Sequence, residues 1–274
     1  MDFQNYDLHV HTSFSDGKNT PKEMIEAAID SGLERIGISD HSYTSFDESY
    51  CMLKERYYEY RTRINALKLH YSDKIAVSLG IEQDFYSDDA AEDFDHIIGS
   101  VHYIKAEPGS CYVPHKGICE SREKNGNAPE YVYIPVDESP EILEFAADNY
   151  FGGDIYKLAE EYYKTVKKVV FRTRCDIIGH FDLISKFNEI SPLFDENDPR
   201  YVNAWQDAAL TLISFGVPFE INTGAISRGY RTVPYPSYEM ISFIRDRGGS
   251  FLLSSDAHSA ENIAYGFDEF YRLL

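Results

Sequence analysis

The stretch Tyr6–Gly17 reads YDLHVHTSFSDG and places Asp7, His9 and His11 at alternate positions of an apolar, strand-like run. Successive side chains of a strand point to opposite faces, so these three stand side by side on one face. Two imidazoles held together in this way are either a costly accident or a set of metal ligands. The stretch therefore predicts a first strand whose end belongs to a functional site, with Asp16 in the turn that follows.

Seven short runs with strand character recur along the chain of 274 residues, and amphipathic segments follow most of them. The strand candidates are 7–10, 35–39, 75–82, 96–101, 175–180, 217–222 and 250–256. The first helical pattern opens with a capping box at Thr20 and Glu23, has Pro21 at its first position and closes at Gly32. The others run over about 51–71, 154–171, 199–215 and 237–247, with a last one after Ala260. This alternation predicts one α/β domain over 1–274, with a largely parallel sheet that is open or closed into a barrel.

The interval from about Lys105 to Pro140 departs from this alternation. It is rich in Gly, Pro, Ser, Lys and Tyr and has no clear period. A structureless loop of this length is uncommon in a compact domain. We interpret 105–140 as an irregular insertion near the functional face, which acts as a lid or an oligomer contact.

Charge and composition exclude several classes of partner. The chain has 26 Lys and Arg against 46 Asp and Glu, for a formal net charge of −20, which disfavours nucleic acid and anionic membrane surfaces. The four cysteines form no CxxC pair and are expected to be ordinary reduced thiols. With neither a secretory pattern at the N-terminus nor an apolar stretch of roughly 20 residues, we expect a cytoplasmic protein. The sequence leaves the oligomeric state open.

Six of the nine histidines lie at or just after the ends of predicted strands. They are His9, His11, His41, His102, His180 and His258. Glu82 and Asp256 also end strands, and Asp16 lies in the first loop. Chemistry in parallel α/β folds gathers at the carboxyl ends of strands, so these side chains point to one pocket. His70, His96 and His115 do not share this position, and we leave them out of the site.

Imidazole and carboxylate ligands together suit zinc, iron or manganese. Nine candidate ligands are too many for one ion with three or four protein ligands. The sequence therefore predicts a cluster of two or three divalent ions, which a carboxylate such as that of Glu82 can bridge.

These residues resemble those of the polymerase and histidinol phosphatase (PHP) superfamily, over nearly the whole chain. The motifs are DLHVHTSFSDG (7–17), ISDHS (38–42), GIEQDF (80–85), GSVHYI (99–104), GHFDL (179–183), EINTG (220–224) and SSDAH (254–258). Each motif is weak alone, but seven in order at strand ends are a strong match. The length, the GSVH element and the segment 220–237 most resemble the monofunctional histidinol-phosphatase branch.

The resemblance implies a distorted (βα)7 TIM-like barrel with a trinuclear metal centre. The implied ligand sets are His9, His11, Glu82 and Asp256 for one ion; Glu82, His102 and His180 for a second; and Asp16, His41 and His258 for a third. Asp7 and Asp40 match positions next to ligands, and we expect them to orient imidazoles by accepting ring N–H bonds.

The implied reaction is the hydrolysis of L-histidinol phosphate to L-histidinol and phosphate, a step of histidine biosynthesis, by hydroxide that bridges two metals. Glu82 would bridge ions, and Asp16 or His258 would help to protonate the leaving group. Because the guanidinium fork suits phosphate, Arg228 and Arg231 in the loop after the sixth strand are the predicted phosphate ligands, at least one of them.

Other functions remain open at this stage. The same site could serve a PHP phosphoesterase of other specificity, for nucleotides, small phosphates or phosphotyrosine. It could also serve a metal-dependent amidohydrolase, or a non-catalytic metal-storing or polymerase-associated domain. Nothing in the sequence selects the residues that bind the rest of the substrate, although Tyr103, Lys186 and the acidic loops are available.

Overall fold

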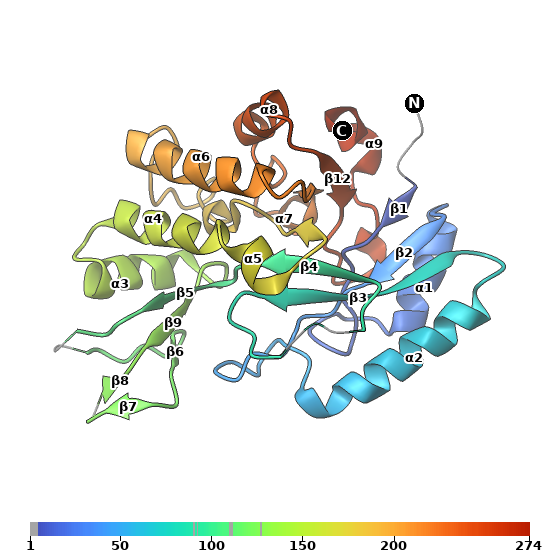
Figure 1. Cartoon of the computed structure of the whole chain (residues 1–274), viewed down its shortest axis with the longest axis horizontal. Coiled ribbons are helices and arrows are strands. Elements are labelled where there is room, and N and C mark those ends of the chain that lie inside the picture. Colours follow the sequence, from blue (N-terminus) through green and yellow to red (C-terminus); the bar gives the residue numbers. More distant parts are fainter. Residues whose placement is uncertain (1–4, 90, 92, 110–111, 127) are drawn as a thin grey trace.

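A seven-stranded parallel barrel forms the centre of the protein (Figure 1). The computed structural model describes residues 5–274 except 90, 92, 110, 111 and 127. The barrel strands, in their order around the sheet, are β1 (Tyr6–Asp7), β2 (Arg35–Ile38), β3 (Ala76–Asp84), β4 (His96–Ser100), β10 (Ile177–Ile178), β11 (Phe219–Asn222) and β12 (Phe251–Ser254). Every pairing between neighbours in this order is parallel. The seven predicted strands are therefore confirmed, several of them shorter than predicted.

The barrel closes between its first and last strands. Val10 pairs with Ala257 in a parallel bridge, and the amide of His11 donates to the carbonyl of Ala257 over 2.9 Å. Because this contact lies beyond the ends of the short β1 and of β12, the barrel is distorted. The predicted TIM-like architecture is confirmed.

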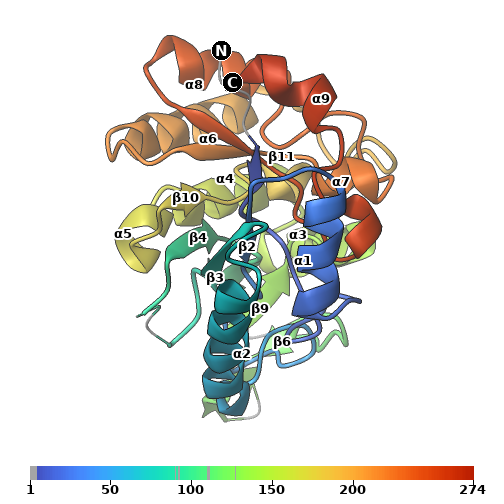
Figure 2. The ribbon, with the colours of Figure 1, turned by 90° about the vertical axis from the view of Figure 1, so that its right-hand side faces the viewer.

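Helices cover the outside of the barrel (Figures 1 and 2). They are α1 (Pro21–Asp30), α2 (Tyr57–His70), α3 (Pro140–Tyr150), α4 (Ile155–Val166), α5 (Val169–Thr173), α6 (Pro199–Ile213), α7 (Gly224–Ser227), α8 (Tyr238–Asp246) and α9 (Phe267–Phe270). Short 3-10 turns lie at Lys54–Arg56 (η1), Leu183–Ser185 (η2), Ala260–Asn262 (η3) and Tyr271–Leu273 (η4). None of the described helices is both long and apolar enough to cross a bilayer.

The start of α1 shows how local sequence sets an element. Thr20 caps the helix by accepting from the amide of Glu23, whose carboxylate accepts from the amide of Thr20 in return. Such a cap contributes about 1 kcal/mol to helix stability. Gly32 follows the helix with φ +77°, a left-handed conformation that glycine adopts without strain. The predicted capping box is confirmed.

His96 is the buried first residue of β4 and so lies at the amino end of that strand, away from the carboxyl ends where the other histidines meet. Its ring nitrogens lie 2.9 Å from the hydroxyl of Ser78 and 2.9 Å from the carbonyl of Leu8. A Cβ at Gly80 would lie 2.3 Å from the His96 ring, so only glycine leaves room for the imidazole. His96 is therefore a structural residue, as its sequence context indicates.

The segment after β4 is more ordered than its sequence suggests. β5 (Tyr103–Ala106), β9 (Val132–Pro135) and β6 (Cys119–Glu120) form an antiparallel sheet, and β7 (Lys124–Asn125) pairs with β8 (Ala128–Pro129). This sheet extends from the barrel beside α3 (Figure 1). The expectation of an irregular 105–140 segment is corrected, because Val132, Ile134 and Val136 alternate into a buried face.

The cysteines of the described residues are free thiols. Cys51 and Cys175 are buried, Cys119 is partly exposed, and none forms a disulfide. Cys111 lies outside the described residues.

Candidate metal centre

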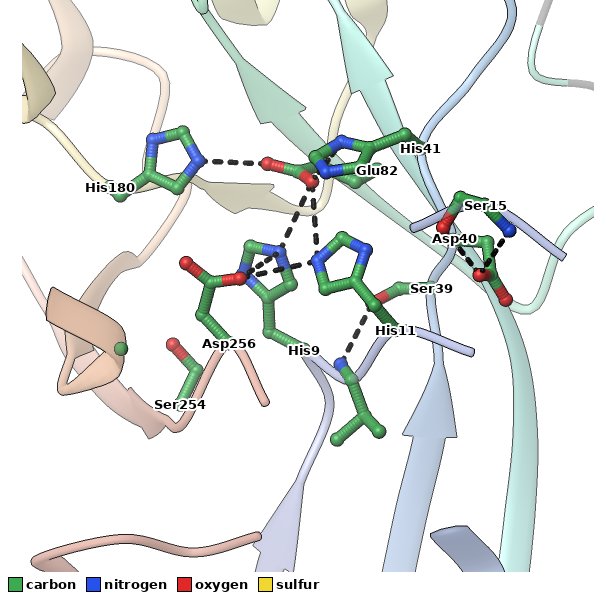
Figure 3. Close-up of polar contacts among 12 residues, drawn as sticks. His9, His11, Ser15, Ser39, Asp40, His41, Glu82, His180, Ser254 and Asp256 are labelled. Carbon is green, nitrogen blue, oxygen red and sulfur yellow. Dashed lines mark hydrogen bonds and ion pairs between the residues drawn. The ribbon is translucent and has the colours of Figure 1, made fainter. Parts of the chain in front are cut away.

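The predicted strand-end side chains meet at the carboxyl end of the barrel. Figure 3 shows the rings of His9, His11, His41 and His180 gathered around the carboxylate of Glu82, with Asp256 beside them. The ring centres of His11 and His41 lie 4.3 Å apart. The remaining predicted members of the set, Asp16, His102 and His258, adjoin the same group.

Glu82 is the central carboxylate of this group. Its Oε1 lies 2.8 Å from Nε2 of His180 and 3.3 Å from Nε2 of His102. Its Oε2 lies 2.7 Å from Nδ1 of His41, 3.4 Å from Nε2 of His9 and 3.5 Å from Nε2 of His11. A carboxylate whose two oxygens face different imidazole sets has the geometry of a bridging ligand.

Three groups of side chains place their ligand atoms within 4.8 Å of one another. They are His11, Asp16, His41 and His258; His9, His11 and Asp256; and His41, Glu82 and His102. These groups share members with the three ligand sets that the resemblance implies. They differ in that His11 and His41 each belong to two groups, and that His180 joins through its contact with Glu82.

The donor atoms fit divalent metal ions. Nε2 of His9, Nε2 of His11 and Oε2 of Glu82 are fully buried and make no hydrogen bond within the described part of the chain. Buried polar atoms without a hydrogen bond are costly unless another ligand satisfies them. An imidazole–carboxylate set of this kind is what zinc, iron or manganese requires.

The surroundings of Glu82 and His11 shift the pKa values of both side chains. Burial alone would raise the pKa of the Glu82 carboxyl, but the imidazoles of His41 and His9 hold it well below its usual range. Burial, with His258 and His41 nearby, lowers the pKa of His11 to about 3. Glu82 is therefore ionised and His11 neutral at neutral pH, as metal binding requires, whereas nearby carboxylates raise the pKa of His9 and His102, so these two rings would release protons when a metal binds.

Two carboxylates that the sequence analysis did not select orient the imidazoles. Oε2 of Glu220 lies 2.8 Å from Nδ1 of His9, and Oδ2 of Asp84 lies 3.1 Å from Nδ1 of His102. Both contacts leave Nε2 of the ring facing Glu82. Glu220 and Asp84 each lie within a motif of the resemblance, and their inward position on a strand end was the available signal.

Among the residues that the structure describes, neither Asp7 nor Asp40 accepts from an imidazole nitrogen, and that expectation is corrected. Asp7 accepts from the amides of His9 and Ser255 and from the Ser255 hydroxyl, which ties the first strand to the last. Asp40 accepts from the amides and hydroxyls of Thr12 and Ser15. Both carboxylates hold the backbone that carries the ligands.

Replacing Asp84 by asparagine is expected to lower metal affinity by about 10–100-fold, because the ring of His102 loses the carboxylate that orients it. The check is a competition titration of the metal-free variant with a chromophoric chelator. Asp88→Asn, at an exposed position of the following loop, is the matched control and should bind metal like the unchanged protein. An Asp84→Asn variant with unchanged affinity would contradict the role given to Asp84.

A cavity of about 470 Å³ opens above the cluster. Its lining includes Asp16, His41, His102, His180, Asp256 and His258 from the candidate centre, and Asp47, Tyr50, Tyr103, Asp137, Glu138, Lys186, Arg228 and Tyr230 from the walls. Lys18 also lines the cavity, so three of the lining residues outside the candidate centre are cations (Lys18, Lys186 and Arg228) and three are acids (Asp47, Asp137 and Glu138). The cavity thus combines a ligand cluster at its base with groups that can recognise a charged molecule.

Arg228 reaches this cavity and Arg231 does not. The guanidinium of Arg228 donates to the carbonyl of Asp256 over 3.1 Å and lies 3.3 Å from its carboxylate. The side chain of Arg231 is 2% exposed and is paired with Asp182, outside the cavity lining. Of the two predicted phosphate ligands, the structure therefore places only Arg228 beside the ligand cluster.

The barrel and its imidazole–carboxylate cluster define a class, the βα barrels with a candidate metal centre at the carboxyl ends of the strands. Within that class, the PHP domain model matches residues 7–224. The chain belongs to the PHP family.

The chain is also similar to individual proteins and solved structures. A probable histidinol-phosphatase of Deinococcus radiodurans is 27% identical over 272 residues, with 95% of this chain and 89% of the relative covered. The structure of a putative histidinol phosphatase from Listeria monocytogenes has a TM-score of 0.74 at 17% identity, covering 97% of this chain and 99% of the other.

A histidinol phosphate phosphatase from Lactococcus lactis was solved in complex with zinc, L-histidinol and phosphate. Its TM-score is 0.64 at 19% identity, with 99% of this chain and 93% of the other covered. At these identities the structural likeness shows the shared fold.

Proposed function

We propose that this protein is a metal-dependent phosphomonoesterase that hydrolyses L-histidinol phosphate to L-histidinol and phosphate. The observation that carries the proposal is the Glu82 carboxylate, which five imidazoles approach within 3.5 Å at the base of a cavity that also holds Arg228. The names of the Deinococcus radiodurans relative and of the two solved structures support the choice of substrate.

The residues that would hold divalent ions are His9, His11, Asp16, His41, Glu82, His102, His180, Asp256 and His258. Ions bound there would lower the pKa of water and neutralise charge on the phosphate oxygens. The number of ions, two or three, and their identity as zinc, manganese or iron are part of the proposal.

Of the cations that line the cavity, Arg228 and Lys186 are the two that would bind the phosphoryl group. Both line the cavity, Arg228 from the loop after β11 and Lys186 from the loop after β10. The formal net charge of −20 makes such local cations necessary for an anionic substrate. Lys186 Nζ donates to the carbonyl of Asp137 over 2.7 Å, which fixes the ammonium at the cavity wall.

Asp16 and His258 are the groups placed to move a proton. Asp16 is the most exposed of the candidate ligands, at 32%, and its Oδ2 lies 3.2 Å from Nε2 of His258. If two ions occupy the other groups, a proton shared by this pair can pass to the departing alkoxide. If a third ion binds here, the same two side chains are its ligands.

The segment 105–140 would contribute to substrate choice. Asp137 and Glu138 follow β9 and form an acidic wall with Asp47. Burial, together with Asp47 and Asp137, raises the pKa of Glu138. A substrate with an ammonium group relieves this repulsion, and L-histidinol phosphate carries one.

Glu138→Gln should therefore raise KM for L-histidinol phosphate about fivefold, equivalent to about 1 kcal/mol for an exposed ion pair. KM for an alkyl phosphate without an amine should not change, which steady-state phosphate release can establish. Glu141→Gln, on the exposed first turn of α3, is the matched control. An equal rise in KM for both substrates would exclude recognition of the amine by Glu138.

A panel of phosphomonoesters tests the proposal itself. Metal-loaded protein should show a higher kcat/KM for L-histidinol phosphate than for nucleoside monophosphates, phosphotyrosine or simple sugar phosphates. Equal values across the panel would identify a PHP phosphoesterase of broad specificity. Absence of phosphate release from every substrate would contradict the proposed activity.

A further inference from the structure

The buried Arg231 joins the loop that carries Arg228 to the loop that carries Lys186. Lys186 directly follows Ser185, the last residue of η2, in the loop after β10. Arg228 directly follows α7 in the loop after β11, three residues before Arg231. The separation of the two cations therefore depends on how these two loops are held together.

The contacts of Arg231 cross from one loop to the other. Its Nη1 lies 3.3 Å from Oδ2 of Asp182 and donates to the hydroxyl of Ser185. Its Nε lies 3.7 Å from Oε1 of Glu189. The neighbouring Thr232 adds two hydrogen bonds of 2.8 Å, from its amide and its hydroxyl, to Oε2 of the same Glu189.

Short, tightly packed segments connect Arg231 to the cavity wall on both sides. The amide of Tyr230 donates to the carbonyl of Ala225 over 2.9 Å, and the amide of Arg228 donates to that of Gly224 over 3.2 Å, so the chain from α7 to Arg231 is a compact turn. In the opposite loop, Lys186 Nζ lies 5.0 Å from the ring of Tyr230. A shift of the Arg231 contacts is therefore transmitted to residues of the cavity wall.

We propose that Arg231 is a positioning residue that sets the distance between Arg228 and Lys186 and so the affinity of the cavity for a phosphoryl group. This inference rests on the proposed function to the extent that the anion is that of the substrate. Arg231 itself touches neither the cavity nor the anion. Its Nη1 contacts both Asp182 and Ser185, and its Nε faces Glu189, so one buried guanidinium contacts three residues of the loop after β10.

If the ion pair of Arg231 with Asp182 only stabilised the fold, removing it would lower stability without changing phosphate affinity. Removing Arg231 leaves the carboxylate of Asp182 buried, so stability falls whether or not the loops position anything. Thermal unfolding alone cannot separate the two cases. The affinity for phosphate, measured at unchanged metal content, separates the two cases, because only a positioning role of Arg231 would change it.

The experiment is a double-mutant cycle with metal-loaded protein and inorganic phosphate as the probe, read by calorimetry. Arg231→Gln should raise the Kd of phosphate about tenfold or more, because small misplacements of binding groups are costly. In the Arg228→Ala background, Arg231→Gln should raise the Kd of phosphate by less than about a further twofold. The distance that Arg231 sets no longer affects the anion once the Arg228 side chain is absent. Arg231→Lys should recover part of the affinity.

Two further variants keep the test decisive. Glu189→Ala loosens the same contact without burying an unpaired charge, and it should weaken phosphate binding in the same direction. Arg200→Gln removes an arginine that pairs with Asp154 and Glu160 on the helical layer, and it should leave the Kd unchanged. If Arg231→Gln fails to fold, Arg231→Lys and Glu189→Ala decide the matter.

Unchanged phosphate affinity in the folded Arg231 and Glu189 variants would overturn the inference, as would effects of Arg231→Gln and Arg228→Ala that simply multiply. A different result would contradict the proposed function. If L-histidinol phosphate is not hydrolysed but the phosphate cycle behaves as stated, the substrate is wrong and the positioning role stands.

Discussion

Glu82→Gln is expected to lower phosphate release from L-histidinol phosphate by about 10³-fold or more and to reduce the number of bound metal ions. Both oxygens of Glu82 face imidazoles of the candidate centre, and an amide cannot bridge two cations as a carboxylate does. The measurement is phosphate release under saturating metal, combined with elemental analysis of the same preparation.

Glu48→Gln provides the comparison for this variant. Glu48 is a partly exposed carboxylate near the cavity whose Oε1 accepts from the hydroxyl of Tyr43, and its replacement should change neither rate nor metal content. Because glutamine keeps the shape of the side chain, the fold of Glu82→Gln should persist. Full activity with full metal content in Glu82→Gln would show that Glu82 is not a ligand.

Removal of metal is expected to lower thermal stability and to abolish activity reversibly. At 100 times Kd, one bound ion stabilises the folded state by about 2.7 kcal/mol, and two or three ions by proportionally more. At roughly 2–4 °C per kcal/mol, the melting temperature should fall by about 5 °C or more on chelation. Thermal unfolding followed by fluorescence, before and after dialysis against a chelator, measures this shift.

The Glu82→Gln variant is the internal control for chelation. Its melting temperature should respond much less to the chelator, because its affinity for the ions is already reduced. Re-addition of zinc, manganese or iron to the unchanged protein should restore both stability and rate. A chelator that leaves both properties of the unchanged protein intact would contradict a resident metal centre.

The positions of the candidate ligands could be predicted from sequence because two simple regularities coincide. The alternation of Asp7, His9 and His11 fixes one face of a strand, and the βα alternation fixes which strand ends meet. Both regularities can be read from the order of residue types along the chain, without knowing how individual side chains pack. The barrel and the convergence of the histidines therefore follow from local patterns.

The partners of those ligands could not be predicted in the same way. Whether Glu220 or Asp7 orients His9 depends on the pairing of β11 with β10 and on how the short β1 bends beyond its last paired residue. Arg228 and Arg231 lie three residues apart in one loop, and only the turn after α7 decides which of them reaches the cavity. These differences depend on how strands pair and how loops turn in the folded protein, which a single sequence does not show.

We propose that these side chains bind the divalent ions with which the protein hydrolyses L-histidinol phosphate. A titration of metal-free protein with zinc or manganese, with bound metal and phosphate release from L-histidinol phosphate measured in the same samples, tests it most directly. We expect no phosphate release without metal, and a rate that rises with bound metal to a plateau at two or three ions per chain. Release by the metal-free protein, or metal bound at this ratio without any release, would contradict it.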